Sequence, residues 1–356
     1  MCDHAPARMS LPVVKVVVVV LNWNGLSDTI ECIDALLSQT YRSRHIVLID
    51  NGSDGDDYEQ LQARYGDIPE ITLCRNAANL GFTRGVNRAL RQLVGVNGLQ
   101  YIALLNNDAV PELDWLARII ETAETTGAAA VASKMVNYYD CDHLDNAGHI
   151  FLSTGEVLPR GGSQPVARFS NRATVIGPCA GAALYRTSLF WDIGLFDEYF
   201  VSGYEDAEFG LRATLGGYST AYDPTAVVYH KISRSVDKIR DLNYAVKLAQ
   251  DINYTYIKLM PGPLLWGGAP LLLTKVAVIC ITAAVLGRWR LLRVQYLALR
   301  STWQQRAILA EYRREHRGFR RLSSFQVWRL QTCFLPTYIG YFRRYILRRK
   351  PTVFER

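Results

Sequence analysis

The chain has 356 residues, of which 49% are hydrophobic and 21% are charged. This composition is that of a globular protein and excludes a disordered chain, a collagen or a small disulfide scaffold. The net charge of +7 is unevenly distributed: residues 288–356 hold 17 Lys and Arg against 3 acids (+14), whereas the first 287 residues hold 23 basic and 30 acidic residues (−7). A basic segment of this kind favours a phosphate-bearing partner, either nucleic acid or anionic lipid head groups.

The cysteine pattern and the first apolar stretch both indicate an intracellular protein. Seven cysteines are scattered without a CxxC pair, which favours a reducing environment over an exported disulfide framework. The apolar stretch from Val13 to Leu21 contains Lys15 and continues into Asn22-Trp23-Asn24. It therefore predicts a buried strand and not a signal peptide, with residues 1–12 as a flexible tail before it.

Short β-branched runs alternate with helical patterns over the first 230 residues, as expected for a layered α/β fold. Strands are predicted at residues 16–21, 46–49, 71–74, 101–105, 182–185, 219–222 and 226–229. Helices are predicted from a cap at Ser27 or Asp28 to Leu37, at 84–93, from Pro111 in a first helical turn, near Ser188, and at 205–215 before Gly216-Gly217. The punctuated segment 137–174 predicts a long, partly ordered excursion.

After about residue 240 the chain changes character. Leu264 to Gly287 is almost wholly apolar, with Lys275 and Pro270 as interruptions. Its length suits one membrane span, but a central Lys costs about 2.5–3.5 kcal/mol on insertion scales. We therefore predict an interfacial or re-entrant hairpin followed by amphipathic basic helices such as Val294 to Arg314. A buried core helix is the alternative.

Polar residues collect just beyond the predicted strand ends, which is the edge where open α/β sheets bind ligands. The first group is Asp50-Asn51-Gly52-Ser53-Asp54. A carboxylate at a strand end, followed by a tight glycine turn, suits recognition of the hydroxyls and base edge of a nucleotide. The alternative is an Asx-turn that only reverses the chain.

The second group is Asn106-Asn107-Asp108 at the end of a strongly apolar strand. A carboxylate in this place can hold Mg²⁺ or Mn²⁺, which take oxygen ligands and share them with substrate phosphates. Only Asp108 is charged, so a diphosphate and a further residue would have to complete the coordination. His230, at the end of the strand through Val227 to Tyr229, is the candidate, with a purely structural histidine as the alternative.

The third group, Gly203-Tyr204-Glu205-Asp206, stands at a predicted helix N-terminus. Acids there are stabilised by the helix dipole, so capping is one interpretation. The other is a catalytic carboxylate on a rigid element, which removes a proton from an attacking hydroxyl. Glu208 and Arg212 stand four residues apart and could simply pair on the helix surface.

Two other sequence patterns are weaker indications of function. Cys141, His143 and His149 contain zinc-ligand types, but their spacing matches no standard zinc site. Aromatic residues among the C-terminal arginines are compatible with RNA binding, yet no nucleic-acid fold signature accompanies them and the α/β body is net acidic. We therefore expect no nucleic-acid partner.

Eight segments, taken together and in order, resemble one family. They are VVLNWNG (19–25), IDNGSDG (49–55), NLGFTRGVN (79–87), LLNNDAVP (104–111), LDNAGH (144–149), GPCAGAALYR (177–186), GLFDEYFVSGYEDAEFGLRA (194–213) and VVYH (227–230). The chain resembles the inverting family-2 glycosyltransferases of GT-A fold, especially the rhamnosyltransferase-like branch of bacterial cell-envelope polysaccharide synthesis. The likeness covers residues 13–232.

The resemblance implies a GT-A domain at 13–240, a Rossmann-like and mostly parallel sheet flanked by helices, followed by a helical, basic, membrane-associating region at 241–356. It implies a nucleotide-sugar donor, a divalent metal, and catalysis by Asp206 as general base with support from Glu205. It assigns Asp108 and His230 to the metal, with Asn106 in place of the family's first acid. The implied donor-binding residues are Asn22, Asp50, Asn51, Asp54, Asn79, Gly81, Asn87 and Asn107.

The implied reaction is a direct displacement that inverts the anomeric carbon of rhamnose from dTDP-rhamnose. The implied acceptor is a glycan or a polyprenyl-diphosphate-linked sugar at the cytoplasmic face of a bacterial plasma membrane. A single span would separate the basic tail from a body that uses soluble donors, which favours peripheral or re-entrant association. A UDP-hexose donor, or a catalytically inactive nucleotide-sugar-binding module, is the alternative. The sequence leaves open whether the chain forms a homo-oligomer.

Overall fold

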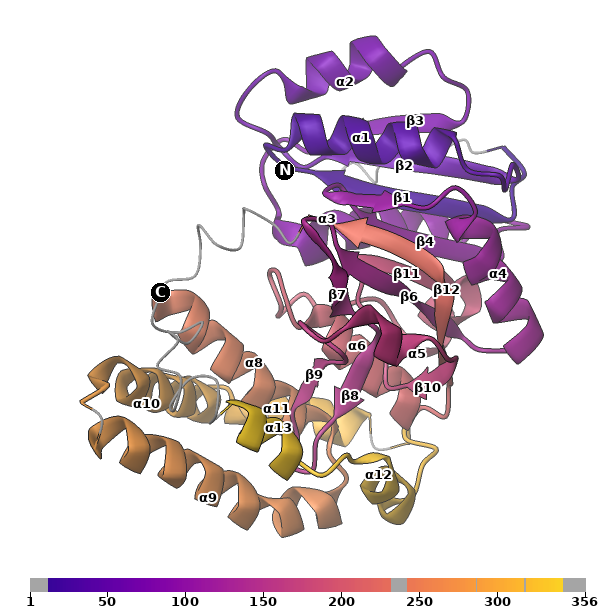
Figure 1. Cartoon of the computed structure of the whole chain (residues 1–356). Helices are drawn as coiled ribbons and strands as arrows, with labels where there is room; N and C mark the ends of the chain where they lie inside the picture. Colours follow the sequence, from indigo (N-terminus) through magenta and orange to yellow (C-terminus); the bar gives the residue numbers. More distant parts are fainter. Residues whose placement is uncertain (1–11, 232–241, 286, 317, 342–356) are drawn as a thin grey trace. The chain divides into compact units, whose positions relative to one another are not determined.

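The computed structural model describes residues 12–231, 242–285, 287–316 and 318–341 (Figure 1). The expected N-terminal tail and the expected boundary at residue 240 lie outside these residues. The chain forms two compact units. The first, which we call the sheet unit, comprises 1–148, 161–209 and 219–232, and the second, the helical unit, comprises 149–160, 210–218 and 233–356.

A ten-stranded mixed sheet forms the sheet unit, with a main path of β10-β12-β6-β11-β4-β1-β2-β3. β1, β2, β3 and β4 run parallel, and β11 enters antiparallel between β4 and β6. β5 and β7 pair with β12 and β6 off this path. The strands are β1 (Val16–Asn22), β2 (Arg44–Asp50), β3 (Ile71–Arg75), β4 (Tyr101–Asn106), β5 (Ala109–Pro111), β6 (Ala130–Asn137), β7 (Asp140–Asn146), β10 (Ala173–Val175), β11 (Ala182–Arg186) and β12 (Thr220–His230).

Helices cover both faces of this sheet, which explains why its central strands are apolar on both sides. Val16 to Val20 are at most 2% exposed, and each fully buried valine contributes about 1.5–3 kcal/mol relative to an exposed one. The helices α1 (Leu26–Leu37), α2 (Asp57–Tyr65) and α4 (Trp115–Thr126) pack on the face of Val18. The opposite face carries α3 (Gly81–Leu93), α5 (Thr187–Ile193) and the start of α6 (Glu205–Leu215).

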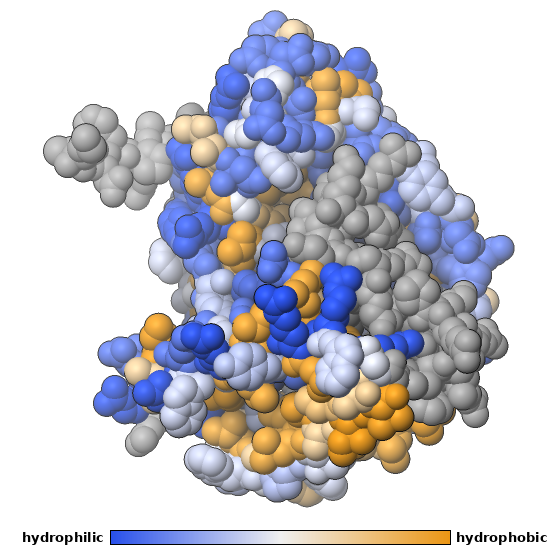
Figure 2. Space-filling view, turned by 90° about the vertical axis from the view of Figure 1, so that its left-hand side faces the viewer, coloured by the Kyte–Doolittle hydropathy of each residue, from blue (hydrophilic) through white to orange (hydrophobic). Residues whose placement is uncertain are grey.

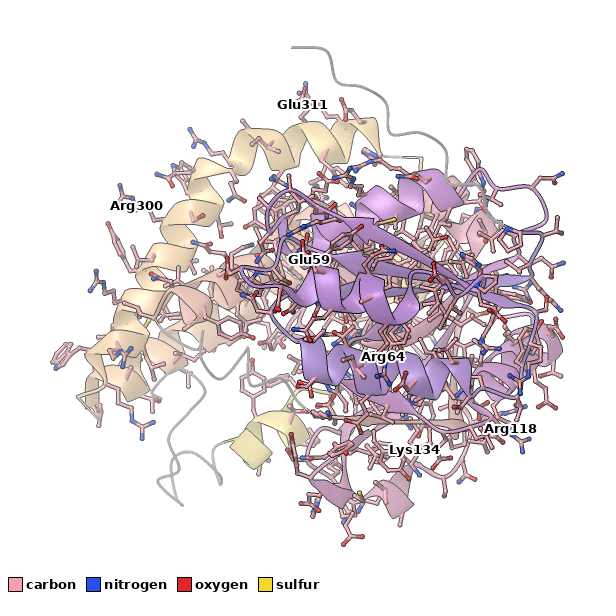
Figure 3. The ribbon with its side chains drawn as sticks, turned by 90° about the horizontal axis from the view of Figure 1, so that it is seen from above. Glu59, Arg64, Arg118, Lys134, Arg300 and Glu311 are labelled. Carbon is pink, nitrogen blue, oxygen red and sulfur yellow. The ribbon has the colours of Figure 1, made fainter. Side chains whose placement is uncertain are left out.

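Charged side chains pair outside the apolar layers. Arg64 of α2, which is labelled in Figure 3, pairs with Asp34 of α1, with 2.7 Å between Nη2 and Oδ2. Arg118 of α4 pairs with Asp114 at 2.9 Å. These pairs are about half exposed, so each is worth at most about 1 kcal/mol.

Three predicted element boundaries in this unit are wrong for local reasons. Pro111 does not open a helix: it lies in β5, opposite Val228 of β12, where a short strand tolerates its missing N–H. The residue before α1 is Gly25, and Ser27 and Asp28 already lie within the helix. The two strands predicted at 219–222 and 226–229 form one strand, β12, with a register shift between Tyr222 and Val227.

The segment 137–174 is ordered, contrary to our prediction. It contains β7, the hairpin of β8 (His149–Phe151) and β9 (Val157–Pro159), the short 3₁₀ helix Val166–Phe169, and β10. The strands are short, and β7 pairs with β6 through two register shifts. The sequence of this segment therefore shows no regular alternation of apolar and polar residues. The hairpin belongs to the helical unit, and the rest belongs to the sheet unit.

Helices dominate the helical unit: α8 (Leu242–Leu259), α9 (Gly262–Val285), α10 (Trp289–Gln304), α11 (Arg306–Glu315), α12 (Ser324–Leu330) and α13 (Leu335–Tyr341). α10 packs against both α8 and α9. The region of Val294 to Arg314, where basic helices are predicted, contains parts of two helices separated at Gln305. α9 is long and apolar enough to cross a membrane by length and composition.

Candidate functional site

Three polar loops meet at one edge of the sheet because the strands that precede them are neighbours in register. Asn22, at the end of β1, stands opposite Asp50 of β2, and Leu21 stands opposite Asn106 of β4. The carboxyl ends of parallel strands share one edge. The structure therefore brings together the first two groups of residues that the sequence singled out, all within the sheet unit.

Asn22 is the centre of a buried hydrogen-bond network. Its side chain is fully buried, and its Nδ2 lies 3.1 Å from Asp50 Oδ1 and 3.0 Å from Asp57 Oδ2. Its Oδ1 accepts from the Thr29 hydroxyl at 2.8 Å and faces the Asn107 amide at 3.5 Å. A network satisfied in this way fixes the loops around it, so the side chain of Asn22 organises this edge from within.

Asp50 is also fully buried and holds the turn that follows β2. Its Oδ1 accepts from the Ser53 hydroxyl at 2.6 Å. The exposed Asp54 is tied to the neighbouring loop: its Oδ2 accepts from Asn24 Nδ2 at 2.7 Å, and its backbone N–H donates to Asn24 Oδ1 at 2.8 Å. Asn24 has φ 52°, a left-handed conformation that asparagine tolerates.

Asn51 joins this edge to the loop before α3. Its Nδ2 donates to Asn79 Oδ1 at 3.0 Å and to the Gly81 carbonyl at 3.3 Å. Gly81 has φ 75°, and a Cβ there would lie 2.7 Å from Val201 Cγ1, so only glycine fits at this close approach. The Gly81 loop consequently packs against the loop that leads into α6.

Asn87, on α3, is a buried residue that contacts the loop before α6. It is 1% exposed and donates to the Phe196 carbonyl at 2.8 Å and to Glu198 Oε1 at 3.1 Å. These contacts hold the 194–204 loop, which ends at the Glu205-Asp206 pair. In this structure Asn87 positions that loop.

Asp108, His230 and Asp145 form a linear hydrogen-bonded chain. His230 Nε2 lies 3.1 Å from Asp108 Oδ1, and His230 Nδ1 lies 2.8 Å from Asp145 Oδ2. Pairing of β5 with β12 sets Ala109 opposite His230, which explains why residues 122 positions apart meet. Asn106 Nδ2 completes the cluster at 3.3 Å from His230 Nε2.

The two carboxylates hold His230 in its charged form. Burial lowers its pKa, but hydrogen bonds to Asp108 and Asp145 outweigh burial and raise the pKa of His230 to about 10. Burial likewise opposes ionisation of Asp108, and the bond from His230 nevertheless keeps its pKa below the usual value. With two carboxylates for one imidazolium, the cluster carries a net negative charge.

This donor set is compatible with a divalent cation. An Asp108 carboxylate oxygen, the Nε2 of His230 and the oxygen of Asn106 are ligand types that Mg²⁺ and Mn²⁺ accept. A cation would take the place of the imidazolium proton between Asp108 and His230. Within the described residues no three Asp, Glu, His or Cys side chains converge on one point, so diphosphate oxygens would have to complete the coordination.

Asp206 stands in the first turn of α6, next to the same edge. Its Oδ2 accepts from the Ala180 backbone N–H at 3.0 Å, and the following carbonyl, of Gly181, accepts from Asn106 N at 2.9 Å. The residue before the helix, Tyr204, has φ 75°. A non-glycine residue in this region is strained, as is often seen at functional sites.

Glu205 is 5% exposed, which places its carboxylate inside the protein beside the half-buried Asp206. Glu208 and Arg212 are 0% and 5% exposed. The expected location of these two side chains on the helix surface is therefore wrong, because both are buried.

Some residues at this edge of the sheet were not predicted from the sequence. Asp145 lies in the LDNAGH segment, but nothing in its local pattern indicates a contact with a histidine 85 positions away. Lys231 follows His230, and its Nζ lies 2.6 Å from Asp28 Oδ1 and 2.5 Å from Glu31 Oε2 of α1. The lysine thus anchors the end of β12. A basic residue directly after the strand was the available signal.

The zinc alternative gains no support from the described residues. Cys141 and His143 lie on β7, and His143 Nδ1 pairs with Asp140 Oδ2 at 2.8 Å. That contact is an exposed local pair at i, i+3.

A mixed α/β sheet with parallel β1 to β4, a crossing β11, and acids at the ends of β4 and at the start of α6 defines a GT-A glycosyltransferase. The chain belongs to glycosyltransferase family 2: residues 16–194, half of the chain, match that family.

A relative in Mycobacterium tuberculosis is an N-acetylglucosaminyl-diphospho-decaprenol L-rhamnosyltransferase, 26% identical over 258 residues that cover 65% of this chain and 80% of the relative. Two solved structures share the fold. GalNAc-T7 with UDP, GalNAc and Mn²⁺ has a TM-score of 0.52 at 15% identity over 67% of this chain and 51% of its own. The mannosyltransferase PcManGT of Pyrobaculum calidifontis with GDP-Man and Mn²⁺ has a TM-score of 0.50 at 17% identity over 87% and 88%.

Proposed function

We propose that this glycosyltransferase moves L-rhamnose from dTDP-rhamnose to a glycan or polyprenyl-diphosphate-linked acceptor in cell-envelope polysaccharide synthesis, with inversion at the anomeric carbon. The observation that carries the proposal is the joint placement of Asp108, His230 and Asp206 around the Asn106–Gly181 backbone contact. The choice of rhamnose and of a lipid-linked acceptor follows the mycobacterial relative.

In this proposal Asp206 is the general base. The N–H of Ala180 holds its Oδ2 in place, and the start of α6 stabilises its negative charge. An acceptor hydroxyl that reaches the carboxylate loses its proton as its oxygen attacks the anomeric carbon from the face opposite the nucleotide. Glu205 supports the orientation of Asp206.

Asp108 and His230 would hold a Mg²⁺ or Mn²⁺ ion, which would stabilise the charge on the departing diphosphate. Asp145 fixes the ring of His230 through Nδ1, so that Nε2 faces Asp108. The nucleotide would lie along the exposed rim of the edge, against Asp54 and Asn79. Asn22, Asp50, Asn51 and Asn107 would shape that rim through their buried network, and Gly81 would allow the close approach of the loop.

Association with the cytoplasmic face of a bacterial plasma membrane completes the proposal. It rests on the +14 charge of residues 288–356 and on the apolar helix α9. Anionic head groups attract such a segment with about 1 kcal/mol per basic residue near the surface. An enzyme held at the membrane would meet a lipid-linked acceptor there.

A thermal-shift panel tests the donor. The full chain is titrated with dTDP, dTDP-rhamnose, UDP-sugars and GDP-mannose, each with and without Mn²⁺ or Mg²⁺. A ligand at 100 times its Kd stabilises the native state by about 2.7 kcal/mol. We expect a metal-dependent shift that is larger for dTDP-rhamnose than for dTDP.

Larger shifts with UDP-sugars would keep the fold and replace the donor, in favour of a hexosyltransferase. If the nucleotides raise the melting temperature but no sugar is transferred to any glycan or lipid-linked acceptor, an inactive nucleotide-sugar-binding module would be favoured. The absence of any nucleotide shift would contradict the proposal.

A further inference from the structure

The helix α9 presents one continuous apolar stripe to the outside of the helical unit. Its exposed positions recur every three or four residues along the whole helix and include no charged side chain. They are Pro263, Trp266, Gly267, Pro270, Leu273, Thr274, Ala277, Val278, Ile281, Ala284 and Val285. Trp266, Leu273, Ile281 and Val285 are 77%, 64%, 64% and 79% exposed. Figure 2 shows apolar side chains gathered over this part of the chain.

The opposite side of α9 carries the helix's one charged residue, and that residue is paired inside the unit. Lys275 Nζ lies 2.7 Å from Glu156 Oε1, and the two side chains are 12% and 10% exposed. The other oxygen of Glu156 accepts from the Thr154 hydroxyl at 2.7 Å and from the Tyr338 hydroxyl at 2.5 Å. Glu156 of the β8–β9 hairpin thus pairs with the lysine at the middle of α9, and Tyr338 of α13 holds Glu156 in place.

Tyr256 of α8 fixes the first half of the same side. Its hydroxyl lies 3.0 Å from the Leu264 carbonyl of α9. A Cβ on Gly268 would lie 2.4 Å from that hydroxyl, and a Cβ on Gly155 of the hairpin would lie 2.1 Å from the tyrosine ring. Both glycines are therefore required for α8, α9 and the hairpin to approach this closely.

Spanning a bilayer is incompatible with these contacts. A span of 24 residues would place Lys275 near the bilayer midplane. Glu156, Thr154 and Tyr338 would then have to enter the hydrocarbon with it, together with the exposed polar backbone of a two-stranded hairpin, which hydrocarbon does not tolerate. A helix that lies flat keeps the inner contacts and buries only its outer stripe.

The neighbouring helix α10 has an exposed face of the type found at membrane interfaces. Trp289, Arg293, Tyr296, Arg300 and Trp303 are spaced by four, three, four and three residues, and all five are exposed. Arg300 extends away from the ribbon (Figure 3). Tryptophan and tyrosine favour the head-group level, where arginine can reach phosphate.

We propose that α9 lies in the plane of an anionic membrane, with its stripe from Trp266 to Val285 in one leaflet and α10 at the head groups, and that it does not cross the bilayer. The proposal rests on the membrane association proposed above and specifies its geometry. Its occupant is an anionic lipid surface because the part of the chain that follows the apolar stripe, residues 288–356, has a net charge of +14.

Depth measurements along α9 test this geometry. An environment-sensitive fluorescent amino acid replaces Trp266, Leu273 or Ile281, one at a time, in the full chain. Each variant is mixed with vesicles of phosphatidylcholine and 30% phosphatidylglycerol that carry nitroxide lipids quenching at shallow or at deep positions. We expect all three positions to be quenched to the same shallow depth. A maximum of depth at position 273, with shallow quenching at both ends, would show a span and overturn the proposal. No quenching at any position would overturn it as well.

A matched pair of substitutions checks the surface without a label. Leu273→Glu is compared with Leu113→Glu in the sheet unit, where Leu113 is 59% exposed. In vesicle sedimentation we expect Leu273→Glu to weaken binding about tenfold, the loss of one buried leucine, and Leu113→Glu to leave it unchanged. Equal binding by both variants would contradict the proposal. None of these readouts uses sugar transfer, so a wrong donor and a wrong membrane geometry remain distinguishable.

Discussion

The sheet unit and the helical unit differ in where their polar and apolar side chains lie. In the sheet unit, buried asparagines and acids gather at one strand edge, where Asn22 alone contacts four other side chains at 2.8 to 3.2 Å. In the helical unit, the Lys275–Glu156 ion pair is enclosed, and the long helix α9 presents apolar side chains to the outside. The first arrangement fixes the loops at that edge, and the second leaves a surface that water solvates poorly.

Removal of the proposed general base is expected to have the largest effect on the sheet unit. Asp206→Asn keeps the hydrogen bond from Ala180 N–H but cannot accept a proton, so sugar transfer should fall about 10²–10⁴-fold. Donor affinity, measured by thermal shift, should be unchanged. Glu121→Gln removes an exposed acid of α4 and is the control, which should stay within a few-fold of wild type. Near wild-type turnover by Asp206→Asn with intact donor binding would exclude this residue as the base.

The enclosed ion pair of the helical unit gives the next largest expected effect. Lys275→Met leaves Glu156 buried without its cation, which typically costs about 3–5 kcal/mol. Urea unfolding measures this loss, and the double variant Lys275→Met/Glu156→Gln should recover much of it because the uncompensated charge is gone. A loss below about 1 kcal/mol in the single variant would mean that water reaches the pair, against the enclosed arrangement.

A smaller effect is expected at Asp145, which contacts the Nδ1 of the proposed metal-binding histidine and not the Nε2 that would bind the metal. Asp145→Asn should weaken Mn²⁺ binding about 10–100-fold, as is usual for partners that orient a ligand. The free-Mn²⁺ signal in electron paramagnetic resonance measures this without turnover. Asp140→Asn, on the same strand β7, is the control. Unchanged affinity in Asp145→Asn would remove Asp145 from the metal-binding arrangement.

The smallest expected effect is a pH dependence of the core. His45 of β2 is 2% exposed, its Nε2 lies 2.8 Å from the Thr72 hydroxyl, and burial lowers its pKa. A lowered pKa in the folded state means that the stability contribution is present above the unfolded pKa of about 6.5 and is lost as the pH falls below it. Melting temperatures between pH 7.5 and 5.5 should therefore fall more steeply for wild type than for His45→Gln. Parallel curves would contradict this assignment.

The sequence predicted most of the sheet unit because its signals are local. Continuous apolar runs marked β1, β2 and β4, and polar residues directly after them marked the ligand edge. Parallel register then brings Asn22, Asp50 and Asn106 together without further information. The Glu205-Asp206 pair was equally readable, since a helix N-terminus follows a Gly-Tyr turn.

The missed features depend on contacts between distant residues. The bond between Asp145 and His230 spans 85 positions, and the pair of Glu156 with Lys275 spans 119. Neither acid has a local pattern that indicates its partner. Lys275 shows this most clearly. From the sequence, the lysine only makes a membrane-spanning helix less favourable. In the structure, its pairing with Glu156 identifies the side of α9 that faces the interior of the helical unit.

The stereochemistry of sugar transfer tests the proposed inverting mechanism most directly. Full-length protein, dTDP-β-L-rhamnose, Mn²⁺ and a polyprenyl-diphosphate-linked N-acetylglucosamine are incubated, and the anomeric signal of the product is followed by NMR. We expect an α-linked rhamnoside that Asp206→Asn does not form. A β-linked product, or transfer that persists in Asp206→Asn, would contradict this mechanism.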